Sequence, residues 1–217
     1  MRELDAIRLG CVPYQEAFEM QTQLHADRAA GRIGDTLVLL EHPHVYTIGR
    51  RGTLADVLWD LETLRARGVE VVETDRGGMV TYHGPGQLVG YPIVDLGPGA
   101  DLVGYLRRIE QAIIATLSDH GLDGGRDEIN TGVWVRRAKI AAIGVRVTRN
   151  VTKHGFALNV TTDLSYFAGI VPCGITDRGV TSMALELGEA PPMHDVASAF
   201  ERAVADVFAF DRVLVHA

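Results

Sequence analysis

Cys173 has the surroundings that best suit a nucleophile. It lies between Pro172 and Gly174. The proline pushes Val171 toward an extended backbone and the glycine permits a positive φ, so we expect the thiol at a sharp bend, as an exposed nucleophile requires. The alternative is a small buried hydrophobe, which is the ordinary role of a free cysteine. The other cysteine, Cys11, falls in a predicted strand and is most simply a core residue.

Lys139 is the residue best placed to assist such a thiol. It is one of only two lysines in the chain, and it begins an apolar run. The two-residue period of a strand predicts that it shares one face with Ala141, Ile143, Val145 and Val147. Desolvation on that face would lower the ammonium pKa, so that the amine could accept a proton from a thiol or, as a cation, stabilise a thiolate. A strand-end lysine that extends into water would do neither, and the sequence leaves both interpretations open.

Residues 76–90 hold five glycines in fifteen positions. Glycine lets the backbone adopt a positive φ or approach a ligand closely, so the stretch is interpreted as a ligand-binding loop between two strands. Arg76 and His83 are the polar side chains through which the loop could contact a ligand, and the simpler alternative is a glycine-rich hairpin turn. His83 and His154 are candidates for acid–base chemistry, although either could instead hydrogen-bond to a loop carbonyl.

Several classes of site are not expected. The glycines at 84, 86 and 90 are spaced one residue too widely for a dinucleotide fingerprint, and no GK[ST] follows. Two cysteines make neither a disulfide framework nor a zinc site, and the eight histidines include no HExxH. We therefore expect no metal. The chain has no apolar run of eighteen residues and no signal peptide, so we expect a cytoplasmic protein without a membrane partner.

Charge is unevenly distributed along the chain. The net charge of −7 argues against nucleic acid as a partner. Residues 126–153, however, hold seven basic and two acidic side chains. This basic strip could steer an acidic macromolecule to one face, or it could be a solvated strand face.

The elements that must position these residues are a mixture of strands and helices. Strands are expected at 4–12, 36–41, 69–73 and 88–96, followed by consecutive strands within 132–160. Helices are expected at 14–30, 54–67, 101–121 and 195–208, with a short helical turn or irregular segment at 164–170. Hairpins and packed helices mixed in this way predict an α+β fold, and residues 1–217 show no linker or repeat, so one domain is expected.

Five stretches together resemble the lipoyl(octanoyl) transferases, the octanoyl-acyl-carrier-protein:protein octanoyltransferases of lipoate biosynthesis. They are Glu41–Arg50, Arg76–Val89, Lys139–Val145, His154–Asn159 and Val171–Ile175. The resemblance implies a mixed sheet with flanking helices and a central acyl pocket, as in the catalytic domain of biotin/lipoate protein ligases. It also implies no cofactor, and it implies partners, namely octanoyl-acyl carrier protein, lipoyl domains of 2-oxoacid dehydrogenase complexes and the glycine cleavage H protein.

The same resemblance implies roles for individual residues. Cys173 would carry the acyl thioester and Lys139 would activate it. The substrate site would be lined by three stretches, which are Arg76, Gly77, Gly78, Met79, Val80, Thr81, Tyr82 and His83, then Ala142, Ile143 and Gly144, then Gly155, Phe156 and Ala157. Backbone N–H groups of 142–144 and 155–157 could stabilise an oxyanion.

Two other functions remain compatible with the sequence. An ATP-dependent lipoate or biotin ligase of the same fold would make an acyl-adenylate and would not need the Cys173/Lys139 pair. A catalytically silent module could keep the fold and the basic strip, and bind carrier or lipoyl domains without transferring an acyl group.

Overall fold

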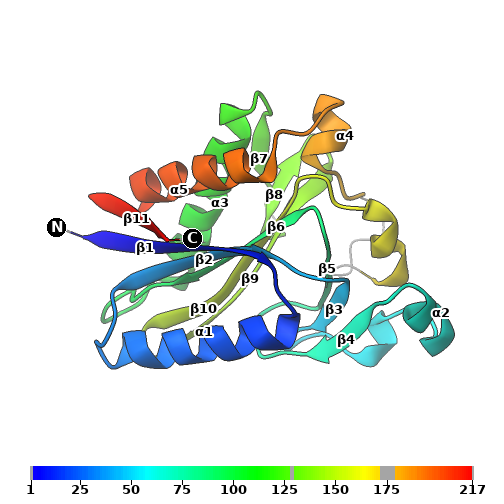
Figure 1. Ribbon diagram of the computed structural model, residues 1–217, viewed down its shortest axis with the longest axis horizontal. Helices are drawn as coiled ribbons and strands as arrows, with labels where there is room; N and C mark the ends of the chain where they lie inside the picture. The colour runs from blue at the N-terminus through cyan, green and yellow to red at the C-terminus, as the bar shows by residue number, and fades with distance from the viewer. Residues whose placement is uncertain (1, 128–129, 172–178, 217) are drawn as a thin grey trace.

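The computed structural model describes residues 2–127, 130–171 and 179–216. A large mixed sheet runs through it, with helices on both faces and a second small sheet at one end (Figure 1). The strand order of the large sheet is β11-β1-β2-β6-β10-β9-β8-β7. Its strands are β1 (Glu3–Cys11), β2 (Asp35–Glu41), β6 (Gln87–Ile93), β7 (Gly124–Arg126), β8 (Val133–Val135), β9 (Ala138–Thr148), β10 (Val151–Asn159) and β11 (Arg212–His216).

The large sheet has a parallel part and an antiparallel part. β11 and β2 both pair in parallel with β1, whereas every pair from β2 to β7 is antiparallel. The hairpin between β9 and β10 turns through Arg149 and Asn150, which have φ angles of 51° and 62°. Two consecutive positive φ values characterise the two-residue turn whose twist matches that of paired strands.

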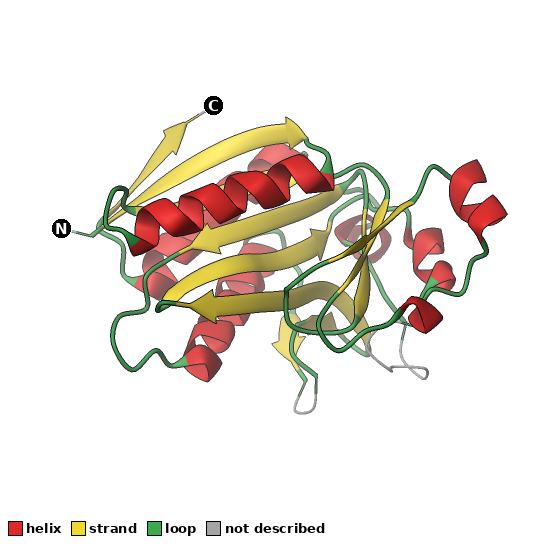
Figure 2. Ribbon diagram, turned by 90° about the horizontal axis from the view of Figure 1, so that it is seen from below, coloured by secondary structure: helices red, strands yellow, loops and turns green. Residues whose placement is uncertain are grey.

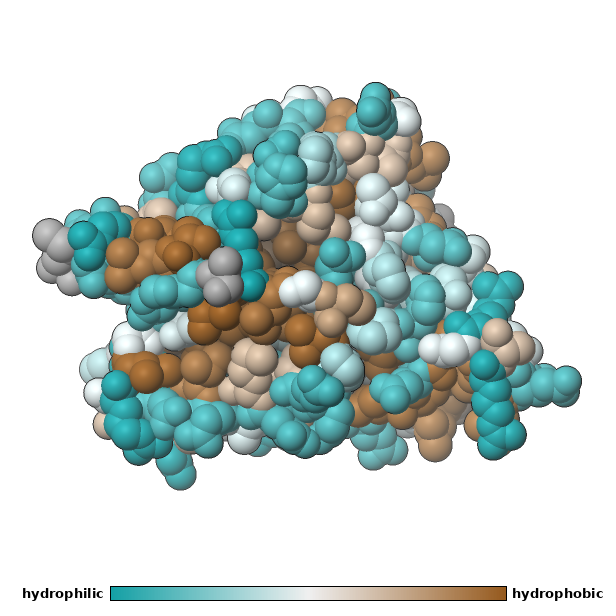
Figure 3. All heavy atoms as spheres, viewed as in Figure 1, coloured by the Kyte–Doolittle hydropathy of each residue, from teal (hydrophilic) through white to brown (hydrophobic). Residues whose placement is uncertain are grey.

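Three long helices bury the two faces of the sheet. α3 (Leu102–Asp119) and α5 (Met193–Phe208) cover one face, and α1 (Tyr14–Ala29) crosses the other, as the view from below shows (Figure 2). The Asp101 carboxylate accepts a hydrogen bond from Gly104 N at the start of α3, and Gly121 (φ 78°) follows its end. Both are standard signals for helix ends. In Figure 3, hydrophilic side chains cover the outer sides of the layers, and hydrophobic ones are visible where the sheet lies between α5 and α1.

The small sheet consists of β4 (Glu70–Glu73), β3 (Val45–Ile48) and β5 (Val80–His83), in that order. It packs with two 3₁₀ turns, η1 (Leu54–Asp56) and η2 (Leu164–Gly169), and with α2 (Leu61–Ala66). Its apolar cluster is separate from the main core and includes Tyr46, Val80, Tyr82 and Ile170. Within the described residues, no helix combines the length and the apolar character needed to cross a membrane.

The mixed sheet with flanking helices confirms the predicted fold class, but some elements differ. The single helix expected at 54–67 is wrong, because η1 and α2 are separate turns and Asp60 caps the second one through Thr63 N. β7, β11 and the short helix α4 (Met183–Leu187) were not foreseen. β7 reads Gly-Gly-Arg and has almost no strand propensity, so only its pairing with β8 makes it a strand.

Candidate active site

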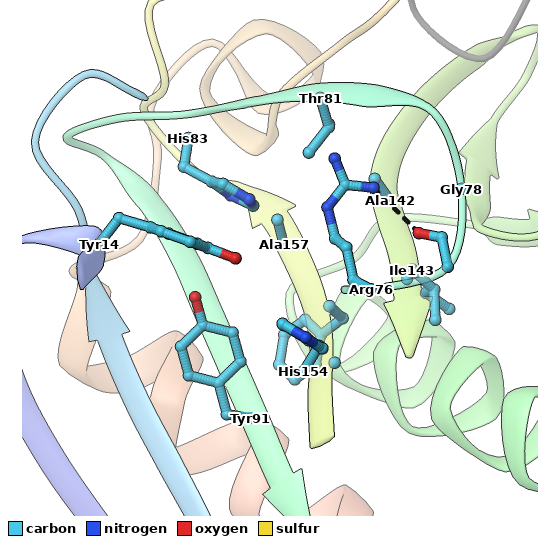
Figure 4. Close-up of a pocket in the computed structure, with 14 residues that line it drawn as sticks. Tyr14, Arg76, Gly78, Thr81, His83, Tyr91, Ala142, Ile143, His154 and Ala157 are labelled. Atoms are coloured by element: carbon cyan, nitrogen blue, oxygen red, sulfur yellow. Dashed lines mark hydrogen bonds between the residues drawn. The ribbon is translucent and has the colours of Figure 1, made fainter. Parts of the chain in front are cut away.

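A pocket with mainly apolar walls lies between the start of α1, the glycine-rich loop and strands β9 and β10 (Figure 4). It encloses about 490 Å³ of empty space, part of which is open to solvent. The residues that line it are Tyr14, Arg76, Gly77, Gly78, Thr81, His83, Tyr91, Ala142, Ile143, Gly144, His154, Gly155, Phe156 and Ala157.

The structure thus brings together most of the residues expected to line a substrate site, although they come from three distant stretches of sequence. Thr81 and His83 face the pocket from β5. Val80 and Tyr82, which were expected beside them, instead belong to the apolar cluster of the small sheet, because alternate side chains of a strand point to opposite faces. Met79, in the loop before β5, is not among the lining residues either.

Close backbone packing holds the glycine-rich loop against β9. Gly77 N donates to Val145 O at 3.1 Å. A Cβ on Gly77 would lie 3.0 Å from that oxygen, and a Cβ on Gly144 would lie 2.9 Å from Gly77 O. Only glycine at both positions lets the loop and the strand come this close.

The Arg76 side chain crosses the upper part of the pocket. It is only 7% exposed, and its Nε and Nη2 donate to Thr47 Oγ1 at 3.0 and 2.8 Å. Its Nη1 donates to Gly77 O at 3.0 Å, the contact dashed in Figure 4. A buried cation therefore fixes the loop from inside and contributes positive charge to the pocket wall.

Two buried histidines flank the pocket and are neutral near pH 7. Burial lowers the pKa of His42 to about 4, although its hydrogen bond to Val12 O opposes the shift. His42 Nε2 lies 2.6 Å from the hydroxyl of Tyr91, whose ring lines the pocket. Burial holds the pKa of His83 well below its usual value, and the charge of Arg76 acts in the same direction.

Asp75 is the centre of a charged cluster beside the pocket. Its carboxylate lies 2.6 Å from Arg146 Nη1, 3.0 Å from Lys153 Nζ and 2.6 Å from His154 Nε2. Burial alone would raise the pKa of Asp75, but hydrogen bonds from His154 and Lys153 outweigh it and lower the pKa to about 2. Burial lowers the pKa of His154 itself to about 4, against the opposing hydrogen bond and charge of Asp75.

Lys139 lies at the start of β9, three residues before the pocket residue Ala142. The expectation that it shares the core face with Ala141 is wrong, because the pairing with β8 shifts by one residue and both Ile140 and Ala141 enter the main core. A bulge of this kind reverses the alternation of side chains. Lys139 Nζ donates to Thr131 O at 3.2 Å and lies 4.9 Å from the centre of the Trp134 ring.

Cys173 lies outside the described residues, but both flanks of its segment are anchored. Val171 N donates to Asp56 O at 2.9 Å before it. After it, Lys139 N donates to Gly179 O at 3.0 Å, and Thr181 N donates to Lys139 O at 2.9 Å. The chain that carries Cys173 therefore returns to the sheet at Lys139.

The backbone donors expected for an oxyanion are mostly engaged. β10 is an interior strand, paired with β6 on one side and β9 on the other, so the N–H groups of Gly155, Phe156 and Ala157 point into these ladders. On β9, Val145 O accepts from the glycine-rich loop, so by alternation the N–H of Ile143 points to the same outer edge. Ile143 is the residue of the three in 142–144 whose N–H is directed away from β10.

Several site residues were not foreseen as such. Tyr14 and Tyr91 come from different sides of the pocket, and their hydroxyl groups point toward each other (Figure 4). Asp75 had no distinguishing signal except its position beside Arg76. Among the described residues, no group of three or more His, Cys, Asp or Glu side chains is arranged to hold a metal ion.

Comparison with known proteins gives consistent matches. The lipoyl protein ligase A/B catalytic domain family matches residues 13–205. A protein from Solibacter usitatus named octanoyltransferase is 53% identical over 212 residues, covering 97% of this chain and 96% of the relative. Another of that name, from Mycobacterium leprae (strain TN), is 49% identical over 209 residues, covering 94% of this chain and 87% of the relative.

Solved structures show the same fold at low sequence identity. The chain superposes on lipoate-protein ligase A bound with ATP with a TM-score of 0.76 at 18% identity, covering 100% of this chain and 89% of the other. For the biotin protein ligase of Aquifex aeolicus the TM-score is 0.55 at 11% identity, and the superposition covers 96% of this chain and 70% of the other. The fold and the pocket thus define a catalytic domain of the biotin/lipoate protein ligase superfamily. Within that superfamily the chain belongs to the lipoyl(octanoyl) transferase family, and it is an acyltransferase.

Proposed function

We propose that this enzyme transfers an octanoyl group from acyl carrier protein to a lysine of lipoyl domains, through a thioester on Cys173. The acceptors would be the lipoyl domains of 2-oxoacid dehydrogenase complexes and the H protein of glycine cleavage. The observation that carries the proposal is an apolar pocket on β9, the strand that also bears Lys139. Burial of about six methylene groups there would contribute on the order of 5 kcal/mol, enough to hold an octanoyl chain.

The reaction takes place in two acyl transfers. The Cys173 thiolate attacks the carrier thioester, the carrier sulfur leaves, and it takes up the proton that Cys173 gave to Lys139. A lysine amine of the acceptor then attacks the Cys173 thioester. The C–N bond forms, the C–S bond breaks, and Lys139 moves the proton of the amine to the departing sulfur. Conversion of thioester to amide is downhill, so the sequence of steps needs no nucleotide.

The two cysteines differ in their suitability for this role. Cys11 is an exposed free thiol, so the expectation that it is a core residue is wrong. Desolvation and the nearby charge of Glu41 raise its pKa, so its thiolate is disfavoured. Cys173 belongs to the segment that returns to the sheet at Lys139, which supports its assignment as the nucleophile. We propose that the Lys139 ammonium favours the Cys173 thiolate, as a cation close to a thiol does.

The mass of the intact protein tests the proposal. Incubation with octanoyl-acyl carrier protein, without nucleotide, should add one octanoyl group, and a lipoyl domain should then remove it. Cys173→Ser should abolish the adduct, whereas the matched variant Cys11→Ser should retain it. Transfer that depends strictly on ATP and Mg²⁺ would favour the ligase alternative. Binding of carrier protein without acylation would favour the silent module.

A further inference from the structure

A series of buried polar groups connects the pocket wall with the strand of Lys139. The Arg76 guanidinium donates to Thr47 Oγ1, which lies 3.5 Å from His83 Nε2. On the other side of the ring, His83 Nδ1 lies 2.8 Å from Gln87 Oε1. The Thr47 side chain is fully buried, and the Gln87 side chain is 1% exposed.

The series continues across the sheet. Gln87 Nε2 donates to Tyr82 O at 3.2 Å and to Asn159 Oδ1 at 2.9 Å. Asn159 Nδ2 donates to Thr181 O at 3.0 Å. Thr181 N in turn donates to Lys139 O at 2.9 Å, so the series ends on the main chain of Lys139.

The direction of these hydrogen bonds is determined from the Thr181 end. A backbone carbonyl can only accept, so Thr181 O must face the amide nitrogen of Asn159, and Tyr82 O must face that of Gln87. The amide oxygen of Gln87 is then left for His83, which has to donate from Nδ1. Neutral His83 consequently carries its proton on Nδ1, and its Nε2 is an acceptor.

The hydrogen bonds at the Arg76 end of the series independently indicate that His83 Nε2 is an acceptor. A guanidinium can only donate, and it makes two hydrogen bonds to Thr47 Oγ1, so the hydroxyl proton of Thr47 is directed toward His83 Nε2. The groups that face the His83 ring are Arg76, His42, His154 and the ring of Tyr14, which is stacked on it at 6.1 Å. None of them is an anion, and a second proton on His83 would meet the charge of Arg76.

We propose that this hydrogen-bond series positions the acyl-transfer site. It holds His83 in the neutral Nδ1–H form with its Nε2 turned toward Thr47, and it fastens the main chain of Lys139 to the pocket wall. Gln87 and Asn159 act through Thr181 and are positioning residues. The assignment of the His83 tautomer depends only on these hydrogen bonds. The expected effect of Gln87 and Asn159 on turnover rests on the octanoyl transfer proposed above.

Nitrogen-15 NMR of the imidazole rings in the resting enzyme tests the tautomer without any substrate. We expect His83 to be protonated on Nδ1 only and to show no titration between about pH 5 and 9. A proton on Nε2, or titration near the ordinary histidine pKa of about 6.5, would overturn the assignment. This measurement remains decisive even if the enzyme proves not to transfer octanoyl groups.

Kinetics of Asn159→Asp test the positioning role. The change replaces the Nδ2 donor by an oxygen that repels Thr181 O, so the start of β9 should shift. With an octanoyl thioester of a short thiol, kcat should fall about 10–100-fold, the cost of a small misplacement of a catalytic group, while KM stays within about threefold. Asn150→Asp, the same change in an exposed hairpin turn, should leave both parameters unchanged. Unaltered kcat in a folded Asn159→Asp protein would refute the role.

Gln87→Glu provides a second test if Asn159→Asp does not fold. The carboxylate of the new glutamate still accepts from His83 Nδ1. Its negative charge raises the His83 pKa, and the substitution removes the Nε2 donor to Asn159. We expect His83 to titrate between about pH 5 and 7, and kcat to acquire a new dependence on pH in that range. A pH profile identical with that of the wild-type enzyme would contradict the proposal, because a purely structural glutamine would not couple His83 to turnover.

Discussion

At the level of single residues, the surroundings of Lys139 decide which chemistry is open to it. Its ammonium lies between Thr131 O and the face of the Trp134 ring, so it is partly desolvated, though not by the strand face that the sequence predicted. Two roles are compatible with this position. Lys139 could supply only positive charge beside a thiolate, or it could take up and return protons.

Lys139→Arg separates these two roles. Arginine keeps the charge, but its pKa above 12 prevents it from cycling a proton. We expect kcat to fall about 10²–10⁴-fold, as is typical when a positioned acid–base group is lost, with little change in melting temperature. The other lysine offers a matched control: Lys153→Arg keeps a cation beside Asp75 and should affect stability more than turnover. Near-wild-type turnover of folded Lys139→Arg would leave Lys139 as a charge partner only.

At the level of elements, the Asp75 cluster connects the glycine-rich loop to β9 and β10. Arg146 and Lys153 come from the two strands of the hairpin, and His154 follows Lys153 on β10. His154 has a positive φ of 62°, and its backbone N–H donates to Gln21 Oε1 of α1 at 2.9 Å instead of to a neighbouring strand. One carboxylate thus holds together three elements that border the pocket.

Asp75→Asn should show the contribution of this cluster. The change leaves Lys153, 8% exposed, without its carboxylate. We expect a loss of about 2 kcal/mol at pH 7, below the cost for a fully buried pair because the Asp75 side chain is 30% exposed. Asp75 has a lowered pKa, so its stabilisation is complete above about pH 4 and declines as the pH falls toward 2. Urea unfolding should therefore show a smaller difference in the free energy of unfolding between variant and wild type at pH 3 than at pH 7. An equal difference at both pH values would show that the ionised Asp75 carboxylate is not the source of the stabilisation.

At the level of the whole molecule, the basic strip at 126–153 does not form one surface. Arg126 pairs with Glu110, and Arg146 and Lys153 pair with Asp75. The exposed arginines lie at opposite ends of β9, with Arg136 and Arg137 before it and Arg149 after it. Eleven residues of strand separate these ends, a span of about 35 Å.

Charge reversal can test which face would meet the acidic carrier protein proposed as the donor. Arg136→Glu and Arg137→Glu lie at the Lys139 end, and each should raise KM for octanoyl-acyl carrier protein more than KM for an octanoyl thioester of a short thiol. Arg149→Glu, at the far end of β9, is the matched control and should change neither of these two KM values. The effect should shrink as salt increases, because exposed charges are screened over about 8 Å near physiological ionic strength. Equal effects on both substrates would identify these arginines as a solvated face.

The buried histidines make the folded state sensitive to acid. The folded pKa of His42, about 4, is below the unfolded value of about 6.5, so the unfolded chain binds the proton first as the pH falls. Stability is therefore complete above about pH 6.5 and decreases toward pH 4, by on the order of 3 kcal/mol for this one group. His42→Gln can still donate to Val12 O and accept from Tyr91, and should flatten the pH dependence of unfolding by a similar amount. His194→Gln, a change at an exposed position, should leave the pH dependence of unfolding unchanged. If His42→Gln also left this pH dependence unchanged, His42 would be excluded as its cause.

The sequence by itself determined what local rules encode. Helical spacing and end signals predicted α1, α3 and α5 closely, and the mixture of hairpins and helices predicted the class of fold. The glycines of residues 76–90 indicated a close approach of the backbone. The five stretches that resemble a known family identified the acyltransferase before any contact was visible.

Only the tertiary structure decided what depends on pairing between distant strands. The bulge at Ile140 changes the face of Lys139, and it arises from the register with β8, which no local pattern encodes. The side of β5 that faces the pocket was likewise set by packing of Tyr82 into the small sheet. Asp75, Gln87 and Asn159 are ordinary polar residues in the sequence. Their roles exist because folding buries them, and a buried polar group must find partners wherever the chain has placed them.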